Sequence, residues 1–248
     1  MSIFSYLMEV RERRGGVYLP LLDPDRTSPD RIADVAIRCV SAGADAILVG
    51  SSLLISADFG KVIRDIKSNI EAPLIIHPSG VSQISPGADA ILFLVLISGR
   101  NPELLIGQHI KSAPVLKNYG IEPISTGYIL VESGRKTSVE YMSNTKPIPR
   151  DKVDIAMACA LAAEYIGMKL IYLEAGSGAR WSVPEDMISS VAGYCSLPIV
   201  VGGGIRDPRV ARDKIEAGAS FVVTGNVIEG GGGESLVREF AEAVHVKG

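Results

Sequence analysis

The 248-residue chain lacks the features of disulfide-linked, membrane-spanning and nucleic-acid-binding proteins. Its three cysteines, Cys39, Cys159 and Cys195, are far apart and form no CxxC pair, as is typical of reduced thiols in the cytosol. The most apolar run, residues 90–97, is far shorter than the roughly 20 residues of a transmembrane helix, and the N-terminus has no signal-peptide pattern. A net charge of −3 shows no excess of the basic residues that would bind nucleic acid. We therefore expect a cytoplasmic protein.

Histidine and aromatic residues are also scarce. The three histidines are scattered and have no cysteines beside them, which argues against a zinc site. His77 follows an apolar run and is a candidate to line a site, whereas His109 and His245 fall in predicted helices, as packing or surface residues. Trp181, the single tryptophan, is expected to pack at the rim of the site.

What the chain does contain is a repeated apolar motif. GADAILV at residues 43–49 returns as GADAILF at 87–93 and, more loosely, as GASFVV at 218–223. Eight apolar runs predict strands near 17–22, 46–50, 73–77, 90–97, 124–131, 169–174, 198–202 and 220–225. Helical patterns lie between most of them, near 30–41, 59–69, 102–117, 152–166, 184–193, 208–217 and 234–245. This alternation predicts an α/β fold, a (β/α)8 TIM barrel that forms a single domain over residues 1–248, with a doubly wound open sheet as the competitor.

Two segments depart from the regular alternation. PSGVSQISPG, after His77, is too short and too rich in Pro and Gly for a crossover helix, so the third helix is expected to be missing or irregular. Residues 132–152 are polar, basic and longer than a usual βα loop. They follow the fifth predicted strand, at the face where barrel enzymes build active sites. This segment is either a disordered insertion or a lid over the substrate, and its position favours the lid.

Glycine turns follow the last three predicted strands. The turns are Tyr172–Gly178 (YLEAGSG), Gly202–Arg206 (GGGIR) and Thr224–Asn226 (TGN). Glycines in such turns let backbone N–H groups approach an anion closely. One glycine pair alone is most often a tight turn, but three adjacent turns predict a binding site for a phosphate-bearing ligand.

Two acidic positions stand beside this predicted cradle. Asp23, in Leu22-Asp23-Pro24-Asp25, ends the first strand, and Ser51 and Ser52 end the second. A carboxylate, a hydroxyl and ligand phosphates form the oxygen shell that Mg²⁺ prefers, although Asp23 or Asp25 could equally cap the turn. Glu174 lies within the first glycine turn, where an acid beside a phosphate is a candidate general base.

Several of these motifs together resemble geranylgeranylglyceryl phosphate synthases. They are LLDPD, GADAILVGSS, the stretch from Thr145 to Ala156, YLEAGSGA, VGGGIR and TGN, which span nearly the whole chain. The resemblance implies a modified TIM barrel without a regular third helix. It also implies an enzyme that joins sn-glycerol 1-phosphate to geranylgeranyl diphosphate with Mg²⁺, the first ether-bond step of archaeal-type lipid synthesis. One branch of the family has a lysine where this chain has Leu21, so a lysine contact to phosphate cannot be transferred.

The resemblance also assigns roles residue by residue. Mg²⁺ is assigned to Asp23 and Ser52. Glycerol phosphate is assigned to Tyr172, Leu173, Glu174, Ala175, Gly176, Ser177 and Gly178, to Gly203 and Gly204, and to Gly225 and Asn226. The partners are then the two substrates; we also expect a homo-oligomer and transient contact with a membrane surface when the product leaves.

The mechanism follows from the chemistry of these substrates. An allylic diphosphate ionises because its cation is delocalised, the cradle positions the 3-hydroxyl, and Glu174 takes its proton or merely positions it. The C20 tail needs an apolar groove, and the gap beside the third strand is the candidate. Another phosphate-binding barrel enzyme, a flavin-dependent oxidoreductase and a non-catalytic binding protein are the alternatives.

Overall fold

The computed structural model describes residues 1–248 except 56–57, 226–232 and 248. Eight parallel strands form a closed barrel in sequence order. They are β1 (Val17–Leu22), β2 (Ile47–Val49), β3 (Leu74–Ile76), β4 (Ala90–Val95), β5 (Glu122–Leu130), β6 (Leu170–Glu174), β7 (Ile199–Gly202) and β8 (Phe221–Thr224). The barrel closes because Val17 of β1 pairs with Phe221 of β8. The predicted TIM barrel is confirmed, and the open-sheet alternative is excluded.

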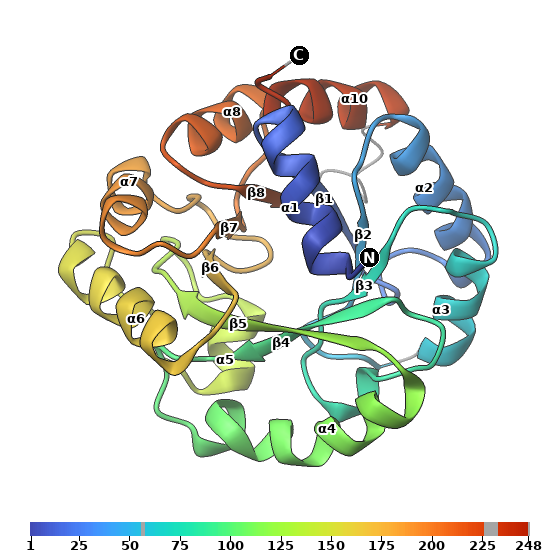
Figure 1. Cartoon of the computed structure of the whole chain (residues 1–248), viewed down its shortest axis with the longest axis horizontal. Coiled ribbons are helices and arrows are strands. Elements are labelled where there is room, and N and C mark those ends of the chain that lie inside the picture. The colour runs from blue at the N-terminus through green and yellow to red at the C-terminus, as the bar shows by residue number, and fades with distance from the viewer. Residues whose placement is uncertain (56–57, 226–232, 248) are drawn as a thin grey trace.

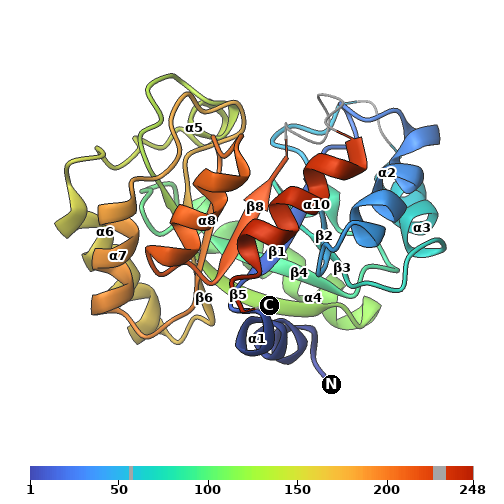
Figure 2. The same ribbon diagram turned by 90° about the horizontal axis from the view of Figure 1, so that it is seen from above.

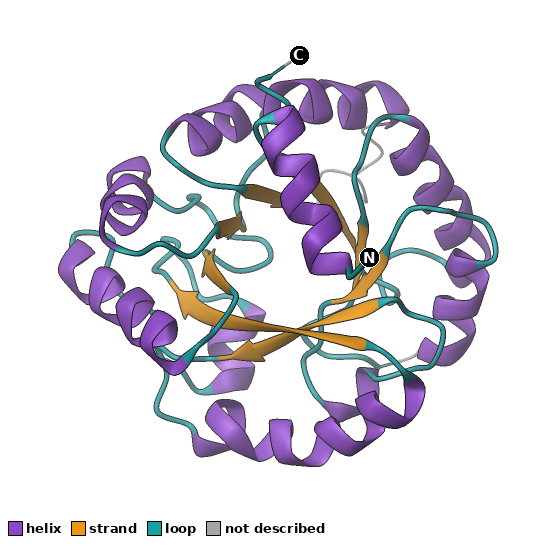
Figure 3. Ribbon diagram, in the orientation of Figure 1, coloured by secondary structure: helices purple, strands orange, loops and turns teal. Residues whose placement is uncertain are grey.

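Helices surround the strands (Figures 1 and 3). They are α2 (Pro29–Ser41), α3 (Phe59–Lys67), α4 (Gln108–Tyr119), α6 (Val153–Ile166), α7 (Glu185–Tyr194), α8 (Pro208–Glu216) and α10 (Gly233–Val244). Local signals set their ends. The Asp207 side chain accepts a hydrogen bond from the Arg209 amide at the start of α8, and Gly218, at φ +113°, lets the chain turn after it. No helix in the described part of the chain is long and apolar enough to cross a membrane.

The β3–β4 connection has no α-helix. A single 3₁₀ turn, η1 (Val81–Gln83), occupies this place, as the short Pro- and Gly-rich segment predicts. A π-helix, η2 (Glu103–Gly107), leads directly into α4 beyond the next strand, and η1 packs against α4. The barrel wall is therefore thin beside β3 and β4.

Two apolar layers hold the barrel together. The outer layer lies between strands and helices, and the inner layer fills the barrel with side chains such as Leu48, Ile75 and Phe221. An N-terminal helix, α1 (Ile3–Arg14), adds Leu7 and Val10 to the inner layer. Figure 2 shows that α1 lies across one end of the barrel, opposite the short helix α5 (Ser138–Ser143). With α1 covering the N-terminal end, the carboxyl ends of the strands form the open end.

Candidate active site

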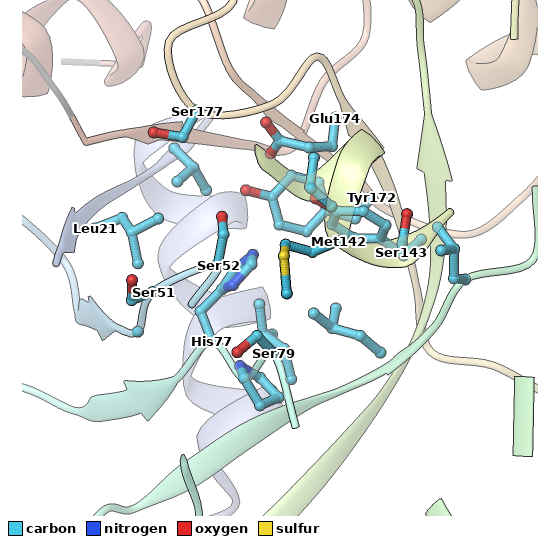
Figure 4. Close-up of a pocket in the computed structure, with 18 of the residues that line it drawn as sticks. Leu21, Ser51, Ser52, His77, Ser79, Met142, Ser143, Tyr172, Glu174 and Ser177 are labelled. Atoms are coloured by element: carbon cyan, nitrogen blue, oxygen red, sulfur yellow. The ribbon is translucent and has the colours of Figure 1, made fainter. Parts of the chain in front are cut away.

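A cavity of about 360 Å³ opens at the carboxyl ends of the strands. Its polar end is lined by residues that follow β1, β2, β6, β7 and β8, among them Asp23, Ser52, Glu174, Ser177, Gly203 and Gly225. Figure 4 shows Glu174 and Ser177 on one side of the cavity and His77 and Ser79 on another. The barrel thus brings together predicted site residues that are up to about two hundred positions apart in the chain.

The β7 turn is built for close backbone approach. Gly203 and Gly204 have φ of +82° and +72°, which only glycine adopts without strain. A Cβ at Gly203 would lie 2.5 Å from Glu174 Oε1, and one at Gly204 would lie 2.8 Å from the Ser182 amide nitrogen. Gly225 is different, because a Cβ there would meet its nearest neighbour, Leu21 O, at an ordinary 3.5 Å. Asn226, also predicted to bind phosphate, lies outside the described residues.

The β6 turn divides its residues between the cavity and the surrounding layer. Tyr172, Glu174, Ser177 and Gly178 line the cavity. Leu173 and Ala175 are buried in the outer apolar layer, and the Gly176 amide is hydrogen-bonded to Glu174. Strand alternation explains the division, since residues two apart share a face. Side-chain contacts with a ligand therefore fall to Tyr172, Glu174 and Ser177, while contacts from Leu173, Ala175 and Gly176 would come from the backbone.

Glu174 is a buried carboxyl group, with 6% of its surface exposed. Its Oε1 accepts the Gly176 amide at 2.5 Å. Burial raises the pKa of Glu174 to about 7, against the opposing effects of the Gly176 amide and the Tyr172 hydroxyl. No lysine, arginine or histidine of the described residues forms an ion pair with it. A carboxyl group with this pKa can exchange a proton near neutral pH.

Asp23 both shapes its turn and faces the cavity. Its Oδ1 accepts the Asp25 amide at 3.0 Å, so the turn-capping interpretation is correct for this oxygen. Its Oδ2 accepts the Ser51 hydroxyl at 3.3 Å and lies 3.5 Å from Arg26 Nε. Burial raises the pKa of Asp23, and the Asp25 amide, the Ser51 hydroxyl and Arg26 oppose the rise.

These groups fit a magnesium ion that also binds substrate. Among the described residues, no three His, Cys, Asp or Glu side chains are placed to enclose a metal ion. Mg²⁺ does not require such an enclosure, because it typically takes one or two carboxylates together with water and substrate phosphates. Asp23 supplies one carboxylate at the cavity, and Ser52 lines the same cavity with its hydroxyl-bearing side chain.

The other end of the cavity is apolar and lies where the third helix is missing. Its walls come from η1, β4, η2, α4 and α5, and include Ile84, Phe93, Leu94, Leu104, Val139 and Met142. The predicted gap beside β3 is therefore a groove continuous with the polar end. The lining residues of η2 and α4 were not predicted, because apolar spacing identifies a helix without identifying the face that lines a cavity.

The segment 132–152 contributes to the same cavity. It contains α5, and Val131 pairs with Ile148 in an isolated β-bridge, so the disordered-insertion alternative is wrong. Val139, Met142 and Ser143 line the cavity, and Figure 4 shows the last two. The structure thus places the segment over the site, as the lid hypothesis requires, while its opening and closing stay a prediction.

The remaining singled-out side chains have distinct places. His77 lines the cavity, as expected. His109 is buried against Phe93 and also lines it, so the packing interpretation is incomplete for this residue. His245 pairs with Asp45 near the N-terminal end of the barrel. Trp181 is half exposed, with Arg150 and Arg180 over its ring, which agrees with a packing role at the rim.

Comparison with known proteins places the chain among enzymes with this geometry. The model of the PcrB family matches residues 8–244. A geranylgeranylglyceryl phosphate synthase of Chitinophaga pinensis is 50% identical over 244 residues, which cover 98% of this chain and 96% of the relative. The enzyme of the same name from Methanosphaera stadtmanae is 41% identical, over 92% of this chain and 93% of the relative.

A solved structure shows the same architecture with a ligand. It is the (S)-3-O-geranylgeranylglyceryl phosphate synthase of Thermoplasma acidophilum in complex with its substrate sn-glycerol-1-phosphate. The two chains are 34% identical and superpose with a TM-score of 0.92, over 99% of each. A barrel of this shape therefore accommodates a glycerol phosphate.

Proposed function

This chain belongs to the PcrB family, and from that premise we propose that it transfers a geranylgeranyl group to the 3-hydroxyl of sn-glycerol 1-phosphate. It is a prenyltransferase of lipid biosynthesis, and diphosphate is the second product. The observation that carries the proposal is the two-ended cavity, with glycine turns and Glu174 at one end and an apolar groove at the other. A flavin enzyme or a sugar-phosphate isomerase needs no such groove.

The glycine turns after β6, β7 and β8 are the proposed phosphate site. Gly178, Gly203, Gly204 and Gly225 line the cavity together with the Ser177 hydroxyl. Backbone N–H groups bind a phosphate without a cationic side chain, which suits a chain with Leu21 where other members have lysine. The phosphate would then hold the glycerol chain with its free hydroxyls toward Tyr172 and Glu174.

Glu174 is the proposed proton acceptor. As the ether forms, the 3-oxygen bonds to C1 of the prenyl chain, the bond from C1 to the diphosphate oxygen breaks, and the hydroxyl proton passes to a Glu174 oxygen. A pKa of about 7 leaves the group largely ionised at slightly alkaline pH while keeping it basic enough to accept a proton. Correct positioning of the two substrates supplies much of the remaining acceleration.

We propose that the reaction also uses Mg²⁺, which Asp23 and Ser52 at the cavity would hold. When bound, the ion would neutralise charge on the leaving diphosphate. The hydrogen bond from Ser51 to Asp23 fixes the orientation of the carboxylate for this role.

The apolar groove is the proposed site of the prenyl tail, with α5 and its neighbouring residues as a lid that excludes water. The further parts of the proposal are a cytoplasmic location, one barrel domain over residues 1–248, a homo-oligomer, and transient contact with a membrane surface as the C20 product leaves. The exposed Leu53 and Met142, which line the cavity, would lie on the exit route.

The test is direct synthesis. Purified protein is mixed with radiolabelled sn-glycerol 1-phosphate, Mg²⁺ and prenyl diphosphates of increasing length, and organic-soluble label is counted. We expect labelled product that is lost on chelation with EDTA and restored by Mg²⁺, and little from sn-glycerol 3-phosphate. No product from any prenyl diphosphate would overturn the proposal.

A further inference from the structure

His77 carries a buried hydrogen-bond acceptor or donor that the fold does not use. It follows β3, and its Nε2 is buried without a hydrogen-bond partner among the described residues. Buried polar atoms in native proteins nearly always have a partner, so an unpaired one that lines a cavity indicates a ligand group or an ordered water. Its ring lies inside the proposed active site (Figure 4).

The state of the ring decides what that partner can be. Burial lowers the pKa of His77 to about 4, so the imidazole is neutral at physiological pH. A hydrogen bond between the ring and the residue's own backbone opposes this fall. Because Nε2 has no partner, we assign the ring proton to Nδ1, the nitrogen that this bond uses. Nε2 then offers a lone pair and needs a donor.

Two tyrosine rings flank the His77 imidazole and define where it lies in the cavity. The His77 ring packs edge to face against Tyr172, with centroids 5.6 Å apart, and against Tyr128, with centroids 6.3 Å apart. Tyr172 is two residues before Glu174 and projects from the same face of β6. The ring therefore lies against β6, the strand that ends in Glu174, beside the part of the cavity where the glycerol moiety is proposed to lie.

The chemistry of the two substrates selects the partner. A prenyl diphosphate offers hydrocarbon and phosphate oxygens, and at neutral pH it has little to donate. The glycerol phosphate offers two hydroxyls, one of which gives its proton to Glu174. Building on the proposed function, we propose that His77 Nε2 accepts a hydrogen bond from the 2-hydroxyl of sn-glycerol 1-phosphate and so determines specificity for the acceptor alcohol.

The experiment compares two acceptors that differ by this hydroxyl. sn-Glycerol 1-phosphate and 3-hydroxypropyl phosphate share the phosphate and the reacting hydroxyl, and the second lacks the 2-hydroxyl. Calorimetry on the full chain gives both Kd values without a prenyl donor. Because an acceptor left unpaired in a buried site weakens binding, the wild type should prefer sn-glycerol 1-phosphate by about tenfold. In His77→Phe the preference should fall to near one, with the Kd of the truncated acceptor unchanged.

Matched variants distinguish loss of the hydrogen-bond acceptor at position 77 from a change in the size of that side chain. His77→Gln keeps an acceptor and should retain part of the preference, whereas His77→Leu should lose it as His77→Phe does. His109→Phe makes the same change at the apolar end, where His109 Nε2 is bonded to Leu94 O at 2.8 Å, and should leave the preference unchanged.

The outcomes are distinct from those of the function test. Equal affinity of the wild type for the two acceptors would overturn the inference, even if no variant folded. So would an equal loss of both affinities in His77→Phe, since that is the signature of a structural role. If the wild type forms product and either result is found, the inference fails while the proposed function stands. If no prenyl donor gives product, the proposed function itself fails.

Discussion

Two buried carboxylates at opposite ends of the barrel have opposite surroundings. Asp45, 4% exposed, precedes β2 at the N-terminal end, and accepts hydrogen bonds from the Tyr18 amide and Arg14 Nη1, both at 2.8 Å. His245 Nε2 lies 2.9 Å from it. Glu174, 6% exposed, ends β6 at the other end and has an amide for a partner but no cationic side chain among the described residues.

The difference separates a carboxylate that stabilises the fold from one that we propose to act on the substrate. Asp45 ties together α1, β1 and the segment after α10, so its negative charge is compensated in the resting protein. Glu174 keeps a raised pKa because the effect of burial exceeds the opposing effects of the Gly176 amide and the Tyr172 hydroxyl, and no cationic side chain of the described residues adds to them. Buried groups with strongly perturbed pKa values concentrate at functional sites. The N-terminal end of the barrel should therefore respond to substitution in stability, and the open end should respond in activity.

The largest effect is expected for Asp23→Asn at the open end. Asparagine can still accept the Asp25 amide, so the turn and the melting temperature should be preserved, while the proposed metal site loses its carboxylate charge. Turnover should fall about 10⁴-fold, or about 5.5 kcal/mol. Steady-state kinetics across a Mg²⁺ titration is the measurement. Activity near that of the wild type at ordinary Mg²⁺ would remove Asp23 from the metal site.

Asp45→Asn should give the opposite pattern at the N-terminal end. It removes the charge that accepts hydrogen bonds from the Tyr18 amide and from Arg14, whose side chain is 38% exposed, and losing such charged hydrogen bonds costs about 3 kcal/mol. Urea unfolding should detect the loss, while kcat of the folded fraction stays unchanged. A drop in kcat without a change in stability would show that the two ends are not separable in this way.

Glu174→Gln should stabilise the folded chain. The folded carboxyl binds its proton more tightly than the unfolded one, so the penalty is absent below the ordinary pKa of 4.5 and complete above about 7. The variant should therefore gain about 3 kcal/mol at pH 8 and almost nothing at pH 4. Unfolding curves at the two pH values test this, and an equal gain at both would show that the charge is not the cause.

The smallest effect should come from the glycine turns. Gly203→Ala places a methyl group against Glu174 and the Gly176 amide, so the KM for sn-glycerol 1-phosphate should rise about tenfold, or about 1.4 kcal/mol. Gly193→Ala, in α7 and outside the cavity, is the matched control, because its methyl group meets nothing within 4 Å. Equal KM values in both variants would place the phosphate elsewhere.

Most of the fold was predictable because strands of a closed barrel are buried on both faces and appear as continuous apolar runs. Every predicted strand is present, and its first and last residues lie within about two residues of the predicted ones. Helix α1 was missed. Its packing depends mainly on Leu7 and Val10 meeting the barrel interior, a contact between distant parts of the chain that local periodicity does not encode.

The site was predictable at its polar end and less so at its apolar end. Glycine turns and acids after strands are visible in sequence, and resemblance added their roles. The walls of the groove, which come from η2, α4 and α5, are not visible in the sequence. Apolar side chains that line a cavity have the same pattern there as those that fill a core. The structure also reveals that Gly176 binds Glu174, a contact between residues two apart that spacing alone does not imply.

The proposal that Glu174 accepts the hydroxyl proton is tested most directly by two constants of Glu174→Gln, kcat and the Kd for sn-glycerol 1-phosphate. Glutamine keeps the size of the side chain and an acceptor for the Gly176 amide, but it cannot take the hydroxyl proton. If Glu174 is the proton acceptor, kcat should fall by about 10²–10⁴ while Kd changes little. Weaker binding with kcat nearly unchanged would contradict it and would make Glu174 a positioning residue.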